Sequence, residues 1–177
     1  MAMAMAIGAA YEKADQFAKA IPFYHEALEY MPLETRVVYR EDLRVVMFDR
    51  LGQCYKQIGD SEAAEKHFKK AIETYDQLKG HLALSPESDS EPSILFKFDE
   101  DILNVFLHYA VFLTTMQRPE DAARARRRLT TIARGSPQLR SQVAKIERQV
   151  DDYIALEKIR EERKLTEIKG DEGSDFV

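Results

Sequence analysis

Two stretches of the chain repeat one spacing of small and aromatic residues. The first set consists of Gly8, Tyr11, Ala20, Tyr24 and Ala27, and the second, at a constant displacement, of Gly52, Tyr55, Ala64, Phe68 and Ala71. Small residues in such a set let two helices approach closely, and aromatic residues fill the wider space farther along. The repetition therefore predicts antiparallel helix pairs stacked one on another.

Turn and stop residues set the limits of these pairs. Pro32 closes the first pair, and Gly59-Asp60 supplies a helix end and a cap in the second. We expect hairpins at about 1–34 and 45–78. A third, less regular copy predicts a hairpin at about 103–136, although an arginine, Arg126, stands where an aromatic residue is expected.

The repeated spacing resembles the tetratricopeptide (TPR) repeat. This resemblance implies an all-α, TPR-like right-handed superhelix of about three helical hairpins plus a C-terminal capping helix, within a single domain at 1–168. It also implies a surface that holds another polypeptide. Co-chaperones of this family hold a chaperone's C-terminal carboxylate with Lys and Asn on the first helix, where Met5 and Ala9 stand here.

The segments outside the repeats have different characters. Residues 35–58 keep helical spacing and predict one long helix, whereas 80–98, with its Ser, Pro and acidic residues, predicts an exposed loop. One apolar stripe predicts a capping helix at 137–168, charged beyond about Leu156, and 169–177 reads as a polar tail.

Residues with catalytic or metal-binding chemistry do not form any known motif. The sequence lacks a phosphate-binding glycine loop, HExxH, a Cys pair and Gly-x-Ser-x-Gly, and its four histidines are scattered. We therefore expect no enzymatic activity, no cofactor and no metal. A single cysteine, Cys54, favours a reducing, intracellular compartment, most simply the cytoplasm, with a cytoskeletal or organellar assembly as the alternative. No apolar run is long enough to span a membrane.

Two surfaces are candidates for partner binding. In a TPR array the first helix of each hairpin lines the concave face, which implies a groove that is apolar near the N-terminus and more polar farther on. Its predicted contact residues are Met5, Ala9, Val46, Asp49, Gln53 and Lys56. An apolar groove suits an amphipathic helix or an extended apolar segment.

The second candidate surface is basic. The stretch from Arg118 to Arg148 contains nine Arg and Lys residues and only three acids, which gives it a local charge of +6 in a chain of net charge −5. The predicted contact residues are Arg124, Arg127, Arg128 and Arg134. They suit an acidic protein surface or RNA phosphates, or they form a solvated face that pairs with nearby acids.

These features predict a protein-interaction module. The leading interpretation is an adaptor or structural subunit of a larger intracellular complex with protein partners. The alternatives are an RNA-associated subunit of a ribonucleoprotein, which would use the arginine-rich hairpin, and a co-chaperone-like regulator.

Overall fold

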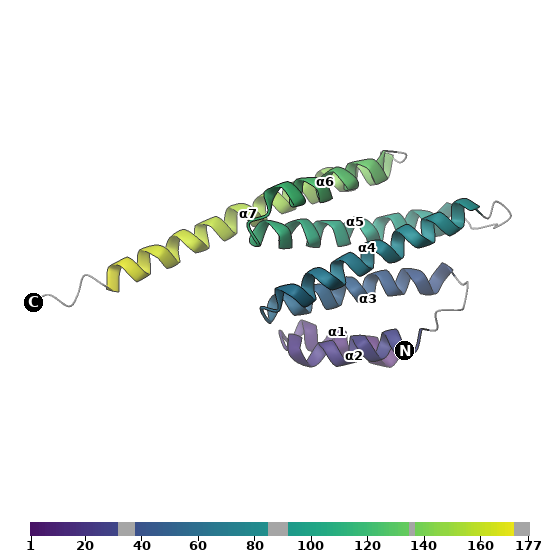
Figure 1. Ribbon diagram of the computed structural model, residues 1–177, viewed down its shortest axis with the longest axis horizontal. Helices are drawn as coiled ribbons and strands as arrows, with labels where there is room; N and C mark the ends of the chain where they lie inside the picture. Colours follow the sequence, from purple (N-terminus) through teal and green to yellow (C-terminus); the bar gives the residue numbers. More distant parts are fainter. Residues whose placement is uncertain (32–37, 85–91, 135–136, 172–177) are drawn as a thin grey trace, which may run out of the picture.

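The structure is a computed structural model that describes residues 1–31, 38–84, 92–134 and 137–171. Within these ranges it contains seven α-helices and no strand, so the predicted all-α class is confirmed (Figure 1). The helices are α1 (Ala2–Lys13), α2 (Phe17–Glu29), α3 (Val38–Gln57), α4 (Ser61–Leu84), α5 (Pro92–Thr115), α6 (Pro119–Ala133) and α7 (Pro137–Asp171).

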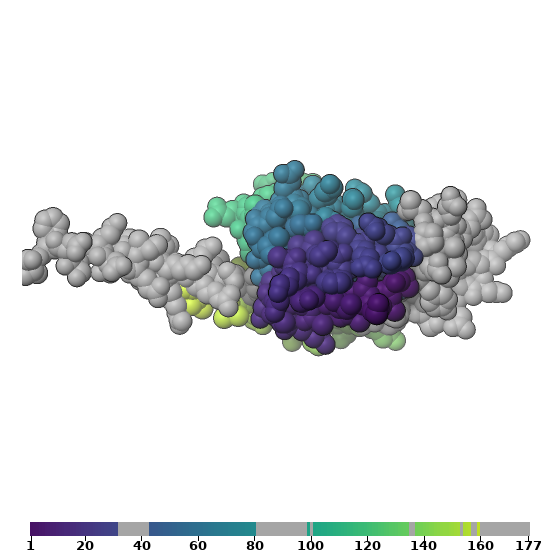
Figure 2. Space-filling view, turned by 90° about the horizontal axis from the view of Figure 1, so that it is seen from below, coloured from purple at the N-terminus to yellow at the C-terminus, as the bar shows by residue number. Residues whose placement is uncertain are grey.

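Consecutive helices form three antiparallel hairpins that stack in layers. The pairs are α1 with α2, α3 with α4 and α5 with α6, and α7 packs on α5 and α6. Between layers, α2 contacts α3, while α3 and α4 both contact α5. Figure 1 shows the α1–α2 layer at one side of the stack, and in Figure 2 this hairpin, in purple and blue, covers the middle of the face in view.

Glycine sets the close approach inside the first two hairpins. A Cβ atom added to Gly8 would lie 2.8 Å from the Tyr24 ring, and one added to Gly52 would lie 2.8 Å from the Phe68 ring. These distances are shorter than carbon atoms tolerate without displacement. Both pairs occupy the same positions of the repeated set, so the predicted alternation of small and large residues is confirmed.

The three hairpin turns share one conformation although only one contains glycine. In each turn the backbone N–H of one residue donates a hydrogen bond to the carbonyl five residues earlier, and the residue directly before that donor has a positive φ. The positive-φ residues are Asp15, Gly59 and Gln117, and the closing bonds run from the backbone N–H of Gln16, Asp60 and Arg118 to the carbonyls of Tyr11, Tyr55 and Leu113. The Asp60 carboxylate also accepts the Ala63 N–H at 3.0 Å, which is the expected helix cap.

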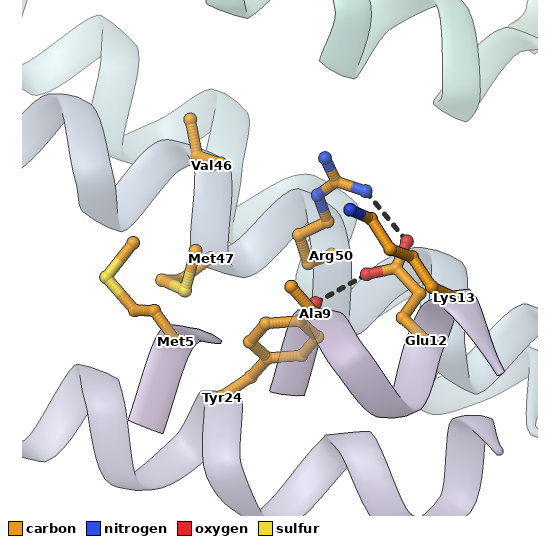
Figure 3. Close-up of a pocket in the computed structure, with 8 residues that line it drawn as sticks. All are labelled: Met5, Ala9, Glu12, Lys13, Tyr24, Val46, Met47 and Arg50. Carbon is orange, nitrogen blue, oxygen red and sulfur yellow. Dashed lines mark hydrogen bonds and ion pairs between the residues drawn. The ribbon is translucent and has the colours of Figure 1, made fainter. Parts of the chain in front are cut away.

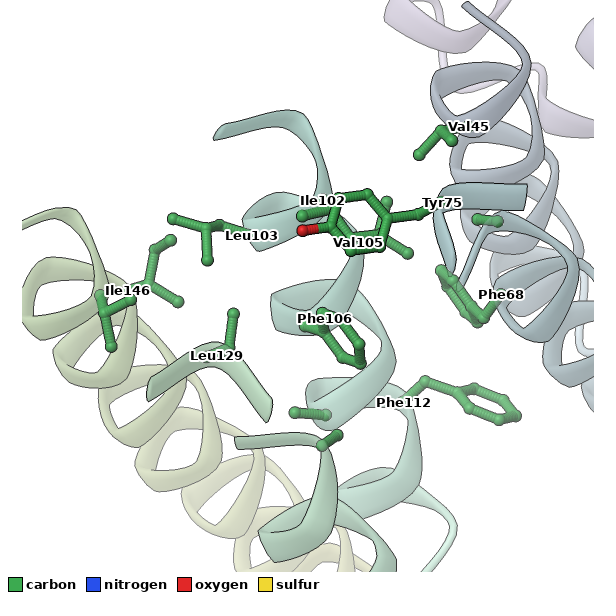
Figure 4. Close-up of a cluster of buried hydrophobic side chains, with 14 of the residues drawn as sticks. Val45, Phe68, Tyr75, Ile102, Leu103, Val105, Phe106, Phe112, Leu129 and Ile146 are labelled. Atoms are coloured by element: carbon green, nitrogen blue, oxygen red, sulfur yellow. The ribbon is translucent and has the colours of Figure 1, made fainter. Parts of the chain in front are cut away.

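The larger core lies around α5, whose side chains reach both neighbouring layers (Figure 4). Phe68 and Tyr75 of α4 pack on one side of it, and Leu129 of α6 and Ile146 of α7 pack on the other. Because α5 is covered on both sides, it is the helix that joins the third hairpin and α7 to the rest of the stack.

The prediction of an exposed loop at 80–98 is wrong over most of its length. Helix α4 continues to Leu84 and α5 begins at Pro92, so only 85–91 lie outside the described residues. Proline is well suited to the first turn of a helix, where its missing N–H has no partner to lose. The neighbouring turns are also tied together, because Asp99 accepts hydrogen bonds from the Tyr75 hydroxyl at 2.7 Å and the Lys79 ammonium at 2.9 Å.

Helix α3 begins at Val38, as expected for a lengthened helix; residues 35–37 of that expectation lie outside the described residues. Helix α7 buries Leu139, Val143, Ile146 and Val150 and then runs beyond the stack to Asp171 (Figure 1). Residues 169–171, predicted as tail, are therefore helical. No described helix has both the length and the apolar content that crossing a membrane requires.

Candidate functional site

A hollow of about 310 Å³ lies between α1 and α3 (Figure 3). We call it hollow 1, and it is lined by Met5, Ala9, Glu12, Lys13, Tyr24, Val46, Met47 and Arg50. Predicted contact residues Met5, Ala9 and Val46 are brought together here. In Figure 3 the side chains of Met5 from α1 and Met47 from α3 lie on opposite walls.

One part of hollow 1 is apolar and adaptable. Met5, Ala9, Val46 and Met47 supply aliphatic or thioether surface. Methionine side chains are flexible and polarizable, so they fit partner side chains of different shapes. This wall can therefore accept an apolar side chain without demanding one particular shape.

The other part of hollow 1 is polar and internally braced. Glu12 accepts a hydrogen bond from the Tyr24 hydroxyl at 2.5 Å and forms an ion pair with Arg50 at 2.7 Å. The ion pair links the first hairpin to α3. Burial, and then the Glu12 carboxylate, raise the pKa of Tyr24 well above its usual range. Lys13 is exposed and makes no ion pair with a described residue, so it is a cation at the rim that a partner can use.

A second hollow, of about 370 Å³, lies between α3, α5 and α7. We call it hollow 2, and it is lined by Gln53, Lys56, Gln57, Phe68, Leu107, His108, Val111 and Gln149. It contains the predicted contact residues Gln53 and Lys56. Side-chain amides both donate and accept hydrogen bonds, so Gln57 and Gln149, which are exposed, can bind the main chain of a peptide.

Asp49, a predicted contact residue, is buried and has partners within the chain. It is only 6% exposed, accepts a hydrogen bond from the Gln53 amide at 2.8 Å and lies 2.9 Å from His108 Nδ1. A buried carboxylate needs such partners because burying it alone would be costly. Asp49 therefore positions two residues of hollow 2 and joins α3 to α5.

The four predicted arginines of the third hairpin differ in their surroundings. Arg124 lies 3.6 Å from Asp121, and Arg128 pairs with Asp76 of α4 at 2.6 Å and lies over the Phe106 ring. Arg127 and Arg134 are exposed and make no ion pair with a described residue. The solvated-face alternative therefore describes Arg124 and Arg128, while Arg127 and Arg134 remain available.

Arg126, the residue that breaks the aromatic pattern, is explained by α7. It pairs with Asp151 at 3.0 Å, so this helix face meets α7 instead of another hairpin. The exposed cations nearby on α7 are Arg140, Lys145 and Arg148, and these too have no ion pair with a described residue. With Arg127 and Arg134 they form the cationic part of the α6–α7 surface.

Sequence reasoning missed several residues of the two hollows. Tyr24, Met47 and Arg50 are in hollow 1, and His108 and Gln149 are in hollow 2. Arg50 follows Val46 by one helical turn, so the helical period was a usable signal. Gln149 comes from α7, and no repeat spacing could place it. Among the described residues no three metal-binding side chains converge.

Comparison with known families agrees with this architecture. Residues 1–77 match the family model of the tetratricopeptide repeat, a part of the chain that holds the first hairpin and nearly all of the second. Repeats of this family generally mediate protein–protein interactions. Among curated proteins, none matches the sequence.

Proposed function

Because residues 1–77 match the family model of the tetratricopeptide repeat, we propose that the protein is an adaptor or structural subunit of an intracellular complex that holds a partner polypeptide along α3. The observation that supports this best is the position of the two hollows. Val46 and Arg50 line hollow 1, and Gln53 and Gln57 line hollow 2. These positions follow one another on one face of α3 at helical spacing, so a single extended or helical segment can contact both hollows.

The chemistry of the hollows indicates what that segment carries. Hollow 1 offers apolar surface with Lys13 at its rim, and hollow 2 combines the apolar side chains of Phe68, Leu107 and Val111 with amides and polar donors. The partner segment therefore combines an apolar side chain for hollow 1 with both apolar and hydrogen-bonding groups for hollow 2. Burying one large apolar side chain contributes about 1.5–3 kcal/mol, enough for one anchor to dominate affinity.

Two methionines on α1 provide a matched test of this binding mode. Met5 lines hollow 1, whereas Met3 lies two residues away and is 76% exposed. We expect Met5→Glu to lose the proteins that co-purify with the wild type, because a carboxylate would be buried against the partner's apolar group. Met3→Glu should retain them. Equal retention by both variants, with both folded by circular dichroism, would place the binding surface elsewhere.

A second candidate surface is the cationic part of the α6–α7 surface, and its partner is an acidic protein segment. Five cations there, Arg127, Arg134, Arg140, Lys145 and Arg148, are exposed and have no ion pair with a described residue. Exposed charges act mainly through long-range attraction, which salt screens within about 10 Å at 0.1 M.

Charge reversal at Arg127 and Arg134 tests this surface. We expect it to weaken partner retention at low salt and to have little effect at high salt, because dissolved ions already screen the attraction between exposed charges at high salt. Charge reversal at Arg124 and Arg128 is the control. It should weaken partner retention less, because these two residues already pair with acids of the chain. Binding of RNA with a steep salt dependence would replace the acidic protein by the RNA alternative.

A further inference from the structure

Two histidines from different hairpins meet beside a tyrosine. His25 comes from α2, His67 from α4 and Tyr55 from α3, and the two imidazole centroids are 5.5 Å apart. The Tyr55 ring stacks on His67 with centroids 5.0 Å apart, and its hydroxyl lies 3.2 Å from His25 Nε2. This histidine pair is therefore part of the contact between the first and second hairpins.

The surroundings of the histidine pair favour neutral rings. His67 is 7% exposed, and its Nδ1 donates a hydrogen bond to the Ala63 carbonyl at 2.7 Å, so the neutral ring carries its proton on that nitrogen. The charged and titratable groups that face the pair are Glu29 from α2, Tyr55 from α3, and Lys66 and Lys70 from α4. Two cations and one acid leave a positive field, which opposes protonation.

Burial and these charges lower the pKa of both histidines. For His25 burial acts first and Lys70 adds to it, with Glu29 opposing. For His67 burial also acts first, the Ala63 carbonyl opposes it, and His25, Lys70 and Lys66 add to the decrease. An unfolded or separated histidine has an ordinary pKa of 6.5. The stabilisation that the neutral histidines give to the hairpin contact is therefore present above pH 6.5 and is lost progressively as the pH falls through that value, because the separated state binds more protons.

The histidine pair and hollow 1 share one helix. Helix α3 carries Tyr55 at the pair, and it also carries Val46, Met47 and Arg50 on the far wall of hollow 1. The near wall belongs to the first hairpin. Whatever separates the first hairpin from α3 and α4 therefore also takes hollow 1 apart, whereas hollow 2, built on α3, α5 and α7, is left in place.

We propose that His25 and His67 are an acid-sensitive contact that controls hollow 1, so that mild acidification loosens the first hairpin and releases a segment bound there. The regulatory consequence rests on the proposed function of hollow 1; the acid-sensitive contact itself does not. Histidine is suited to this role because its charge changes near neutral pH.

The chain contains one cysteine, and it reports on this contact. Cys54 is fully buried, in the apolar cluster that α3 shares with the first hairpin, and burial, followed by Glu12, raises the pKa of its thiol to about 12. The rate at which a pyridyl disulfide labels Cys54 in the native chain, divided by the rate in denaturant at the same pH, measures opening of this interface. Taking the ratio removes the effect of pH on the thiol itself.

We expect the protection of Cys54 to fall between roughly pH 7.5 and pH 5.5, by up to about tenfold for each of the two histidines, because the lower end of this range lies one unit below the ordinary histidine pKa. In the double variant His25→Gln with His67→Phe, which keeps a ring against Tyr55, protection should not change over this range. A wild type with constant protection, or a double variant that loses protection as the wild type does, would overturn the proposal.

A second measurement keeps the test decisive if the double variant is unstable. Nuclear magnetic resonance titration of the wild-type histidine rings should give pKa values for His25 and His67 below that of the denatured chain; values at or above it would overturn the proposal. Neither measurement needs a partner. Loss of binding in Met5→Glu at neutral pH tests the proposed function separately.

Discussion

At the scale of single residues, the fold depends on where side chains are missing as much as on where they are present. Gly52 and Gly80 are both helical glycines of the second hairpin, but a Cβ at Gly52 would collide with Phe68, whereas one at Gly80 would meet nothing within 4 Å. The same residue type is therefore required at one position and unfavourable at the other.

Replacing each glycine by alanine separates these two effects. We expect Gly52→Ala to lower the free energy of unfolding by about 1–3 kcal/mol, because the core must shift to accept the added carbon. Gly80→Ala should raise it by up to about 1 kcal/mol, because alanine loses less backbone freedom on helix formation. Chemical denaturation measures both. Equal effects at the two sites would refute the packing of Gly52 on Phe68.

At the scale of helices, α7 has two parts with different roles. Its first half buries one apolar stripe against α5 and α6, and this is the end-covering role expected for the helix after a repeat array. Farther along, Leu156 and Ile159 are exposed although they are apolar. Only the first half should therefore contribute to stability.

Two leucines on α7 provide a matched test of this division. Leu139 is 2% exposed and Leu156 is 59% exposed. We expect Leu139→Ala to cost about 2–5 kcal/mol, because it leaves a cavity in the core. Leu156→Ala should change stability by no more than about 0.5 kcal/mol. Thermal and denaturant unfolding of both variants would contradict this account if the exposed leucine proved as costly as the buried one.

At the scale of the whole molecule, the sequence predicts the stack well and its surface only in part. The repeated set around Gly8 and Gly52 determines the hairpins because it records contacts inside one repeat. The sequence predicts too long a loop at 80–98, because Gly80 and Pro92 are compatible with a helix. The two helices are also held together there, since Tyr75 and Lys79 both donate hydrogen bonds to Asp99.

Surface roles were harder to predict because they depend on neighbours from distant segments. Helical spacing places Asp49 on the concave side, but it cannot reveal that His108 covers it. Likewise, it places Arg128 among the basic residues without showing its acidic partner, Asp76. Gln149 reaches hollow 2 only because of how α7 packs, which no repeat encodes.

A partner segment on the face of α3 between α1 and α5 is central to the proposed function, and the six methionines of the chain can test for it. Met5 and Met47 line hollow 1, whereas Met3 and Met116 are exposed elsewhere and Met31 is buried outside it. With methyl-labelled methionine, adding the partner that co-purifies with the wild type should shift the Met5 and Met47 resonances and leave those of Met3, Met31 and Met116 in place. Shifts at Met3 or Met116 with Met5 and Met47 unchanged would contradict the proposal.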